Sequence, residues 1–165
     1  MKIGLISDTH DRLSMIDQAI DFFNGENVDL VVHAGDFISP FSVERFRKLR
    51  CPLIAVFGNN DGDHRNLTAS FVSFGAHVSE IIHLFEVDGK KIAVLHGDRD
   101  ELLKNVVQSE VFDLVIYGHT HVFEVKKVGE TTVVNPGECC GYLSGDYTVA
   151  LFDTDSFEAR RIDLG

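Results

Sequence analysis

The sequence predicts an α/β fold in which two mixed β-sheets pack face to face with helices outside them. Up to about residue 80, apolar runs of strand length alternate with amphipathic segments of helical period. A hairpin signal follows, and β-like runs fill the last third of the chain. With 165 residues, 44 % of them hydrophobic, the chain has the size of one domain with a sizeable core. We therefore expect a single domain over residues 1–165.

Strands and helices alternate in the first half of the chain. The expected elements are a strand at 2–7, a helix at 13–23, a strand at 30–32, a helix from Ser39 and Pro40 to about Leu49, a strand at 53–57, and a helical segment around Leu67, Phe71 and Phe74. Ser39 and Pro40 mark a helix start because serine caps a helix and proline suits its first turn.

Beyond residue 80 the pattern becomes antiparallel. Segments 81–87 and 91–95 flank Asp88 and Gly89, a pair that favours a tight hairpin turn. A helix near 100–108, a strand at 114–117 and several β-like runs between Val122 and Ile162 complete the predicted elements.

The composition disfavours general nucleic-acid binding. Fifteen basic and 26 acidic residues give a net charge of -11, which repels phosphate backbones unless the field is reversed locally. Bound divalent cations can supply that reversal, so a small phosphate ester remains an acceptable substrate.

The lengths of the apolar runs and the positions of the cysteines argue against a membrane protein, a secreted protein and a zinc ribbon. No run approaches the roughly 20 residues that span a bilayer, and polar residues interrupt the N-terminal run too early for a signal peptide. We expect no membrane segment and a cytoplasmic location. Cys51, Cys139 and Cys140 form neither a disulfide framework nor a zinc ribbon, so we expect reduced thiols without a function.

Small polar clusters follow five apolar strands. They are Asp8-Thr9-His10, Gly35-Asp36, Gly58-Asn59-Asn60-Asp61, His96-Gly97-Asp98 and Gly118-His119-Thr120-His121. One such aspartate is more often a helix cap or turn former, and one such histidine is more often structural. In α/β sheets, however, ligands bind outside the carboxyl ends of the strands. Five clusters at five strand ends therefore predict one shared site.

The clusters carry the ligand types of a metal centre. Asp8 and His10 are two residues apart, as are His119 and His121, so in extended backbone each pair points to one side. Carboxylate, imidazole and amide donors without thiolate suit Mn²⁺ first, and also Ni²⁺, Fe²⁺, Co²⁺ or Zn²⁺. Seven candidate ligands around a central Asp36 predict two divalent ions per chain. The seven are Asp8, His10, Asp36, Asn59, His96, His119 and His121.

The ordered series Asp-x-His, Gly-Asp, Gly-Asn-x-Asp, His-Gly and Gly-His-x-His resembles the calcineurin-like metallophosphoesterase superfamily over residues 8–121. The turn Asn135-Pro136-Gly137 and the short chain are most similar to its small prokaryotic phosphodiesterase branch. The resemblance implies that one metal is held by Asp8, His10, Asp36 and His121. It implies that the other is held by Asp36, Asn59, His96 and His119.

The expected activity is metal-dependent hydrolysis of phosphate diesters through a dinuclear centre and a metal-bound hydroxide. Asn59 and Asn60 are the candidate catalytic residues beside the metals. Two alternatives remain open: a non-catalytic protein-binding scaffold of the same fold, and a phosphomonoesterase or nucleotide hydrolase. The expected partner is a small phosphate ester, and a homo-oligomer remains open.

The sequence departs from the family pattern at two positions. Asn60 stands where relatives commonly carry a histidine, and a neutral amide cannot protonate a leaving group. Asp98 stands where small members often carry the second histidine of His-Gly-His. Among the other histidines, we expect His33 to be hydrogen-bonded in the core or behind the metals. We expect the remaining ones to lie at the surface, namely His64, His77 and His83.

Overall fold

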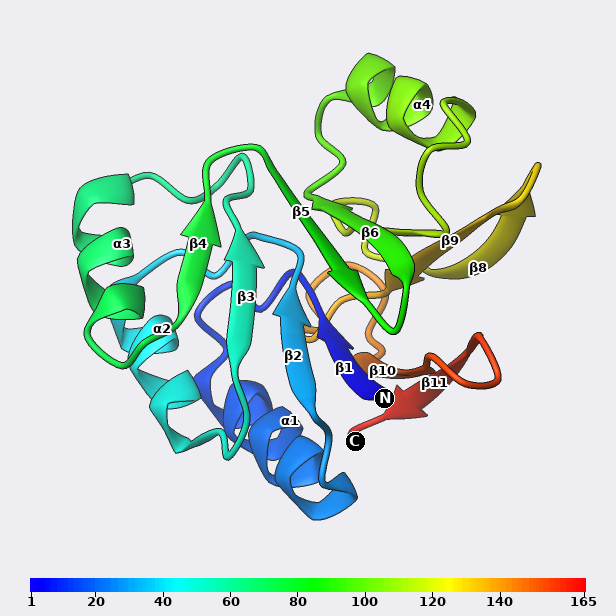
Figure 1. The fold of residues 1–165 in the computed structure, drawn as a ribbon. Helices are drawn as coiled ribbons and strands as arrows, with labels where there is room; N and C mark the ends of the chain where they lie inside the picture. Colours follow the sequence, from blue (N-terminus) through cyan, green and yellow to red (C-terminus); the bar gives the residue numbers. More distant parts are fainter.

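The computed structural model describes all 165 residues and contains two β-sheets that face each other (Figure 1). The first sheet has six strands in the spatial order β11 (Glu158–Asp163), β10 (Thr148–Asp153), β1 (Lys2–Ile6), β2 (Leu30–His33), β3 (Leu53–Val56) and β4 (His77–Ser79). The second has five, in the order β5 (Ile82–Val87), β6 (Lys90–Leu95), β7 (Leu114–Ile116), β9 (Thr131–Pro136) and β8 (Phe123–Val128).

The helices lie on the outer faces of the two sheets (Figure 1). They are α1 (Leu13–Glu26), α2 (Pro40–Arg45) with the 3₁₀ turn η1 (Phe46–Lys48), α3 (His64–Val72) and α4 (Asp100–Gln108). The first three accompany the first sheet, and α4 accompanies the second. The predicted α/β fold with two mixed sheets is confirmed. No helix of the structure combines the length and apolarity needed to cross a membrane.

Parallel pairing in both sheets directs the strand ends to a common edge. Strands β1 to β4 pair in parallel, as do β6, β7 and β9, while the antiparallel strands β10, β11, β5 and β8 complete the sheets. Parallel strands leave their carboxyl ends on one side, where the following loops meet.

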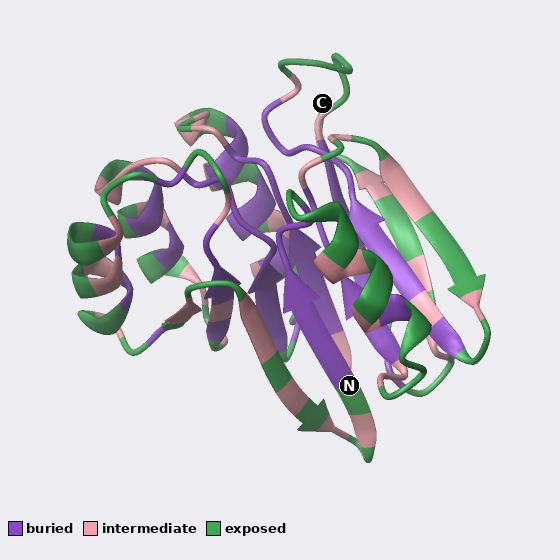
Figure 2. Ribbon diagram, turned by 90° about the horizontal axis from the view of Figure 1, so that it is seen from above, coloured by how far each residue is buried: buried purple, intermediate pink, exposed green.

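The core consists of three apolar layers, one between the two sheets, one between the first sheet and α1 to α3, and a smaller one between the second sheet and α4. Alternate residues of a strand face opposite sides of the sheet, so Ile3 and Leu5 of β1 face the second sheet while Ile6 belongs to the layer beneath the helices. Phe23 of α1 fills that outer layer and leaves no space for a side chain at Gly4. Figure 2 shows the buried strands at the centre and the exposed helical faces outside. Burial on both faces explains the nearly continuous apolar runs.

The structure differs from the expected elements mainly at their boundaries. The segment expected as one helix to Leu49 divides into α2 and η1, and the strand expected at 53–57 ends at Val56. Strand β4 was not expected, because its three residues include the exposed His77 and carry no apolar run. It is held by pairing with β3 at the sheet edge, a tertiary interaction that local pattern does not reveal.

Candidate metal centre

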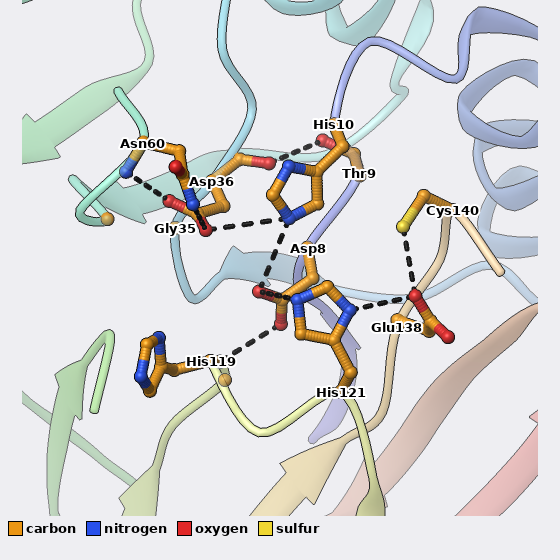
Figure 3. A network of polar contacts seen from close by, with 12 residues as sticks. Asp8, Thr9, His10, Gly35, Asp36, Asn60, His119, His121, Glu138 and Cys140 are labelled. Carbon is orange, nitrogen blue, oxygen red and sulfur yellow. Dashed lines mark hydrogen bonds and ion pairs between the residues drawn. The ribbon is translucent and has the colours of Figure 1, made fainter. Parts of the chain in front are cut away.

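Members of four of the five polar clusters lie together where the loops of both sheets converge (Figure 3), and His96 of the remaining cluster joins them through Asp36 and Asn59. The Asp8 backbone N–H donates to the Gly35 carbonyl at 3.0 Å, and Gly118 N–H donates to the His96 carbonyl at 2.8 Å. His119 N–H donates to Asp8 Oδ2 at 3.1 Å and so joins the two pairs of loops across the sheets. The backbone therefore fixes the relative positions of the predicted ligands.

One half of the site is formed by Asp8, His10 and His121. Asp8 Oδ1 lies 3.9 Å from His10 Nε2 and 3.5 Å from His121 Nε2. The two imidazoles are stacked with ring centroids 5.2 Å apart. His10 Nε2 also lies 3.5 Å from Asp36 Oδ2, which connects this half to the next.

The other half surrounds His96. Its Nε2 lies 3.3 Å from Asp36 Oδ2 and 3.0 Å from Asn59 Oδ1. The His119 ring lies with its centroid 5.1 Å from that of His96. Asp36 is thus next to a histidine of each half, and all seven residues expected from the sequence lie in one continuous group.

Two buried polar atoms of this group lack a hydrogen-bond partner and could bind a cation. Asp8 Oδ1 and His10 Nε2 are buried and have no hydrogen-bond partner, which is rare in folded proteins. The ligand atoms of Asp8, His10 and Asp36 all lie within 4.8 Å of one another. Because oxygen and imidazole donors in this arrangement suit divalent transition-metal ions, the residues present fit the expected metals.

Hydrogen bonds behind two histidines orient their other nitrogen into the site. His96 Nδ1 lies 2.7 Å from the Ala34 carbonyl oxygen, and His121 Nδ1 lies 2.8 Å from Glu138 Oε2. Each acceptor requires a proton on Nδ1, so Nε2 is the atom with which each ring would bind a metal.

The shifted pKa values of three residues indicate that the site stabilises positive charge. Burial raises the pKa of Asp36, but hydrogen bonds from His96 and Asn60 outweigh it and hold the pKa well below its usual range. Burial alone lowers the pKa of His96, whereas the hydrogen bond and charge of Asp36 raise it to about 9. Burial raises the pKa of Asp8, an effect that the His96 charge opposes. The negative charge of Asp36 favours a proton on His96. A metal cation bound between these groups would be stabilised by the same charge.

The backbone at the site is held in the left-handed region, which side-chain-bearing residues seldom adopt. Positive φ angles occur at five of the seven candidate ligand residues: Asp8 (52°), His10 (40°), Asp36 (62°), His119 (66°) and His121 (62°). Such conformations cost on the order of 1–3 kcal/mol each and cluster at functional sites. The fold therefore tolerates local strain in order to direct these side chains to one place.

Two glycines allow the loops to approach closely. A Cβ at Gly58 would lie 2.6 Å from the Asp36 backbone nitrogen, and one at Gly118 would lie 2.8 Å from Asp8 Oδ2. Any side chain at either position would displace a carboxylate that belongs to the site.

The two asparagines of the third cluster are exposed and contact different partners. Asn59 reaches His96 as described above, whereas the Asn60 amide donates to Asp36 Oδ2 at 2.8 Å. The Asn60 backbone N–H also donates to Asp36 Oδ1 at 2.9 Å. Asn60 therefore orients the central carboxylate.

Asp61 is buried beneath these residues. Its carboxylate accepts hydrogen bonds from the backbone N–H groups of Asp36 (2.9 Å), Ile38 (2.7 Å) and Gly58 (2.8 Å). Burial raises the pKa of Asp61 although the backbone hydrogen bonds oppose it. With both oxygens occupied, Asp61 ties the loop after β2 to the loop after β3.

Glu138 was missed by the sequence analysis. It is completely buried, and besides His121 it accepts hydrogen bonds from the Tyr142 and Leu143 backbone and the Ser144 hydroxyl. Burial raises the pKa of Glu138, but the hydrogen bonds from Ser144 and His121 lower it to about 2. A carboxylate behind a ligand histidine orients the ring and raises its basicity. In the sequence, one glutamate after an apolar strand looks like an ordinary turn residue.

The remaining histidines and cysteines have defined places. His33 is buried and hydrogen-bonded to Thr9 Oγ1 and Gly35 N–H, each at 3.1 Å, which confirms the expected supporting role. Burial lowers its pKa to about 3. The three cysteines are free, and the buried Cys140 thiol donates to Glu138 Oε2 at 3.1 Å. That contact was also not expected, because it depends on the folded loop after β9.

Comparisons with known proteins show which family the chain resembles. The family model of the calcineurin-like phosphoesterase superfamily domain matches residues 1–156. A phosphodiesterase of Methanocaldococcus jannaschii is 42 % identical over 166 residues, covering 99 % of each chain. The solved structure of an archaeal phosphodiesterase has a TM-score of 0.95 with 41 % identity and 99 % coverage of each chain.

A second structural neighbour shares the fold at much lower identity. A variant of the Vps29 protein of Entamoeba histolytica has a TM-score of 0.70 and 20 % identity over 99 % of each chain. That likeness concerns the fold alone, whereas the family model and the 42 % identical relative extend over nearly the whole chain. The chain therefore belongs to the calcineurin-like phosphoesterase superfamily, and it is a metal-dependent phosphoesterase as its sequence predicts.

Proposed function

We propose that this protein hydrolyses small phosphate diesters at a dinuclear metal centre. The observation that carries the proposal is the position of Asp36, whose Oδ2 lies 3.5 Å from His10 Nε2 and 3.3 Å from His96 Nε2. A carboxylate that lies between two groups of proposed ligands can bridge two metal ions. The 42 % identical phosphodiesterase of M. jannaschii supports the diester as substrate class.

The proposed ligand sets follow the two halves of the site. One ion is held by Asp8, His10, Asp36 and His121, and the other by Asp36, Asn59, His96 and His119. When bound, two divalent ions, Mn²⁺ foremost, supply a hydroxide nucleophile near neutral pH and polarise the phosphoryl oxygens.

The chain's own residues set the geometry of the reaction. Asn60 holds Asp36, Glu138 holds the His121 ring, and the Ala34 carbonyl holds the His96 ring. Asn59 directs its oxygen toward His96, so its amide N–H donors are free for a phosphoryl oxygen at the exposed side of the site. A substrate oriented in this way reacts with less loss of entropy at the transition state.

Charge favours a singly charged substrate of small size. Two buried carboxylates, Asp8 and Asp36, would oppose four positive charges from two ions, which leaves a positive centre. The surrounding surface is acidic, with a net charge of -11 for the chain, and repels a polyanion. A phosphodiester monoanion fits both conditions.

An activity screen tests this function directly. Protein stripped of metal is supplied in turn with Mn²⁺, Ni²⁺, Co²⁺, Zn²⁺ or Mg²⁺ and offered diesters, monoesters and nucleotides. We expect diester hydrolysis that depends on added metal and exceeds monoester hydrolysis. Faster monoester hydrolysis would replace the proposal with a phosphomonoesterase, and no turnover with any metal would favour a non-catalytic scaffold.

A further inference from the structure

A cavity of about 230 Å³ opens beside the proposed ligands Asn59 and His96. Its walls come from the loop after β3, the loop after β6, the segment before β5 and the start of α4. Ligand pockets usually measure about 300–1,000 Å³, so this cavity suits a single ring system rather than a large ligand. Because it adjoins the metal site, it can receive one of the two ester groups of a bound diester.

The charges in the cavity argue against a second phosphate there. Three acidic residues, Asp61, Glu80 and Asp98, line it, and Arg99 is the only lysine or arginine that does. Asp98 is exposed and accepts no hydrogen bond from the rest of the chain, so its oxygens are free for a ligand. These walls suit an uncharged group that carries N–H donors.

His64 provides a flat surface in this cavity. Its imidazole lies on the Phe57 ring with centroids 3.9 Å apart and an interplanar angle of 2°. The ring is fixed by Glu80 Oε2, 2.8 Å from Nδ1, and by the Asp61 carbonyl oxygen, 2.7 Å from Nε2. Since Phe57 covers one face, the 40 % of the side chain that is exposed lies mainly on the opposite face. The expected surface histidine is thus part of the wall beside the metal site.

We propose that this cavity binds the nitrogen-containing aromatic ring of a nucleoside-type ester group, which names the substrate class of the proposed phosphodiesterase and rests on that function. The ring stacks on the free face of His64, as bases stack on aromatic side chains in other proteins. Its exocyclic amino group donates to Asp98. The substrate is therefore a small diester of a nucleoside such as adenosine.

Two diesters with the same leaving group isolate this contact. Methyl p-nitrophenyl phosphate and adenosine 5′-(p-nitrophenyl phosphate) both lose nitrophenolate as the water oxygen bonds to phosphorus. With the Mn²⁺-loaded enzyme we expect kcat/KM to be at least tenfold higher for the adenosine diester, mainly through a lower KM. Stacking on one aromatic side chain accounts for an effect of this order.

Variants connect that preference to the cavity. His64→Ala should reduce the preference about tenfold, whereas His64→Phe should retain most of it because the flat face remains. Asp98→Ala should reduce the preference for the adenosine diester several-fold without changing the stacking of His64 on Phe57. His77→Ala, which changes an exposed histidine on β4, is the matched control and should leave the preference unchanged.

The outcomes separate this inference from the proposed function. Equal kcat/KM for the two diesters, or a preference that survives both His64→Ala and Asp98→Ala, would overturn the cavity assignment while leaving the phosphodiesterase intact. Turnover of neither diester would instead refute the proposed function. In that case saturation-transfer NMR with adenosine decides the cavity: binding that His64→Ala abolishes would support it, and no binding would overturn it.

Discussion

At the scale of single residues, the Asp36 carboxylate is oriented by Asn60 through contacts that the sequence pattern does not reveal, although it singles out both residues. Asn60 donates to both of its oxygens, once from the backbone and once from the side chain. Glu138 acts similarly behind His121. The proximity of the candidate ligands could be predicted because strand-end clusters recur along the chain. The contacts that support them could not, since each contact depends on which loops meet after folding.

Replacing Glu138 tests the importance of the support behind His121. Glu138→Gln keeps the shape but removes the charge that orients the imidazole, and loss of such a partner typically costs 10- to 100-fold in metal affinity. We expect a loss of that size for one of the two Mn²⁺ ions in calorimetric titrations. Glu130→Gln, on an exposed residue that pairs only with Lys127, is the control. Unchanged Mn²⁺ affinity in a folded Glu138→Gln protein would show that the hydrogen bond has no role in metal binding.

Asn60 predicts how the rate depends on the leaving group. An amide cannot protonate an alkoxide, and general acid catalysis is typically worth about 10²- to 10⁴-fold. Esters with good leaving groups, such as aryl diesters, should therefore react much faster than alkyl diesters. The measurement is the rate for a series of diesters of increasing leaving-group pKa, in the wild type and in Asn60→His. A flat dependence in the wild type that Asn60→His does not change would mean that another group donates the proton.

At the scale of elements, the order of strands and helices follows from local periodicity in the sequence. The edge strands of the sheets, in contrast, depend on pairing with a neighbouring strand. The hairpin of β5 and β6 was expected from its Asp88-Gly89 turn, and it forms as a six-pair antiparallel ladder. Strand β4 exists only through β3. The left-handed backbone at the ligands was also invisible in the sequence, because aspartate and histidine do not require it.

The close approach of the loops after β1 and β7 predicts a severe effect of a single methyl group. In Gly118→Ala the new Cβ would meet Ser7 and Asp8 across the sheets, and overpacking of this kind costs about 1–3 kcal/mol. We expect a lower melting temperature and at least a tenfold weaker Mn²⁺ affinity. Gly62→Ala is the control, because nothing lies within 4 Å of the added atom. Equal Mn²⁺ affinity in the two variants would show that the loops can separate without disturbing Asp8.

At the scale of the whole molecule, the two sheets contribute different candidate ligands to one site. The first sheet supplies Asp8, His10, Asp36 and Asn59 through the loops after β1, β2 and β3, and the second supplies His96, His119 and His121. With the proposed ligand sets, metal binding is coupled to the packing of one sheet against the other. Ions that bind only the folded state stabilise it, so chelation should lower the melting temperature.

The number of ions per chain tests the dinuclear centre most directly. Protein saturated with Mn²⁺ and freed of unbound metal by gel filtration is analysed for its metal content, alongside Asp36→Asn and His121→Ala. The account predicts two ions in the wild type, a loss at both positions in Asp36→Asn and a loss mainly at one in His121→Ala. At most one ion per chain in the saturated wild-type protein would contradict it.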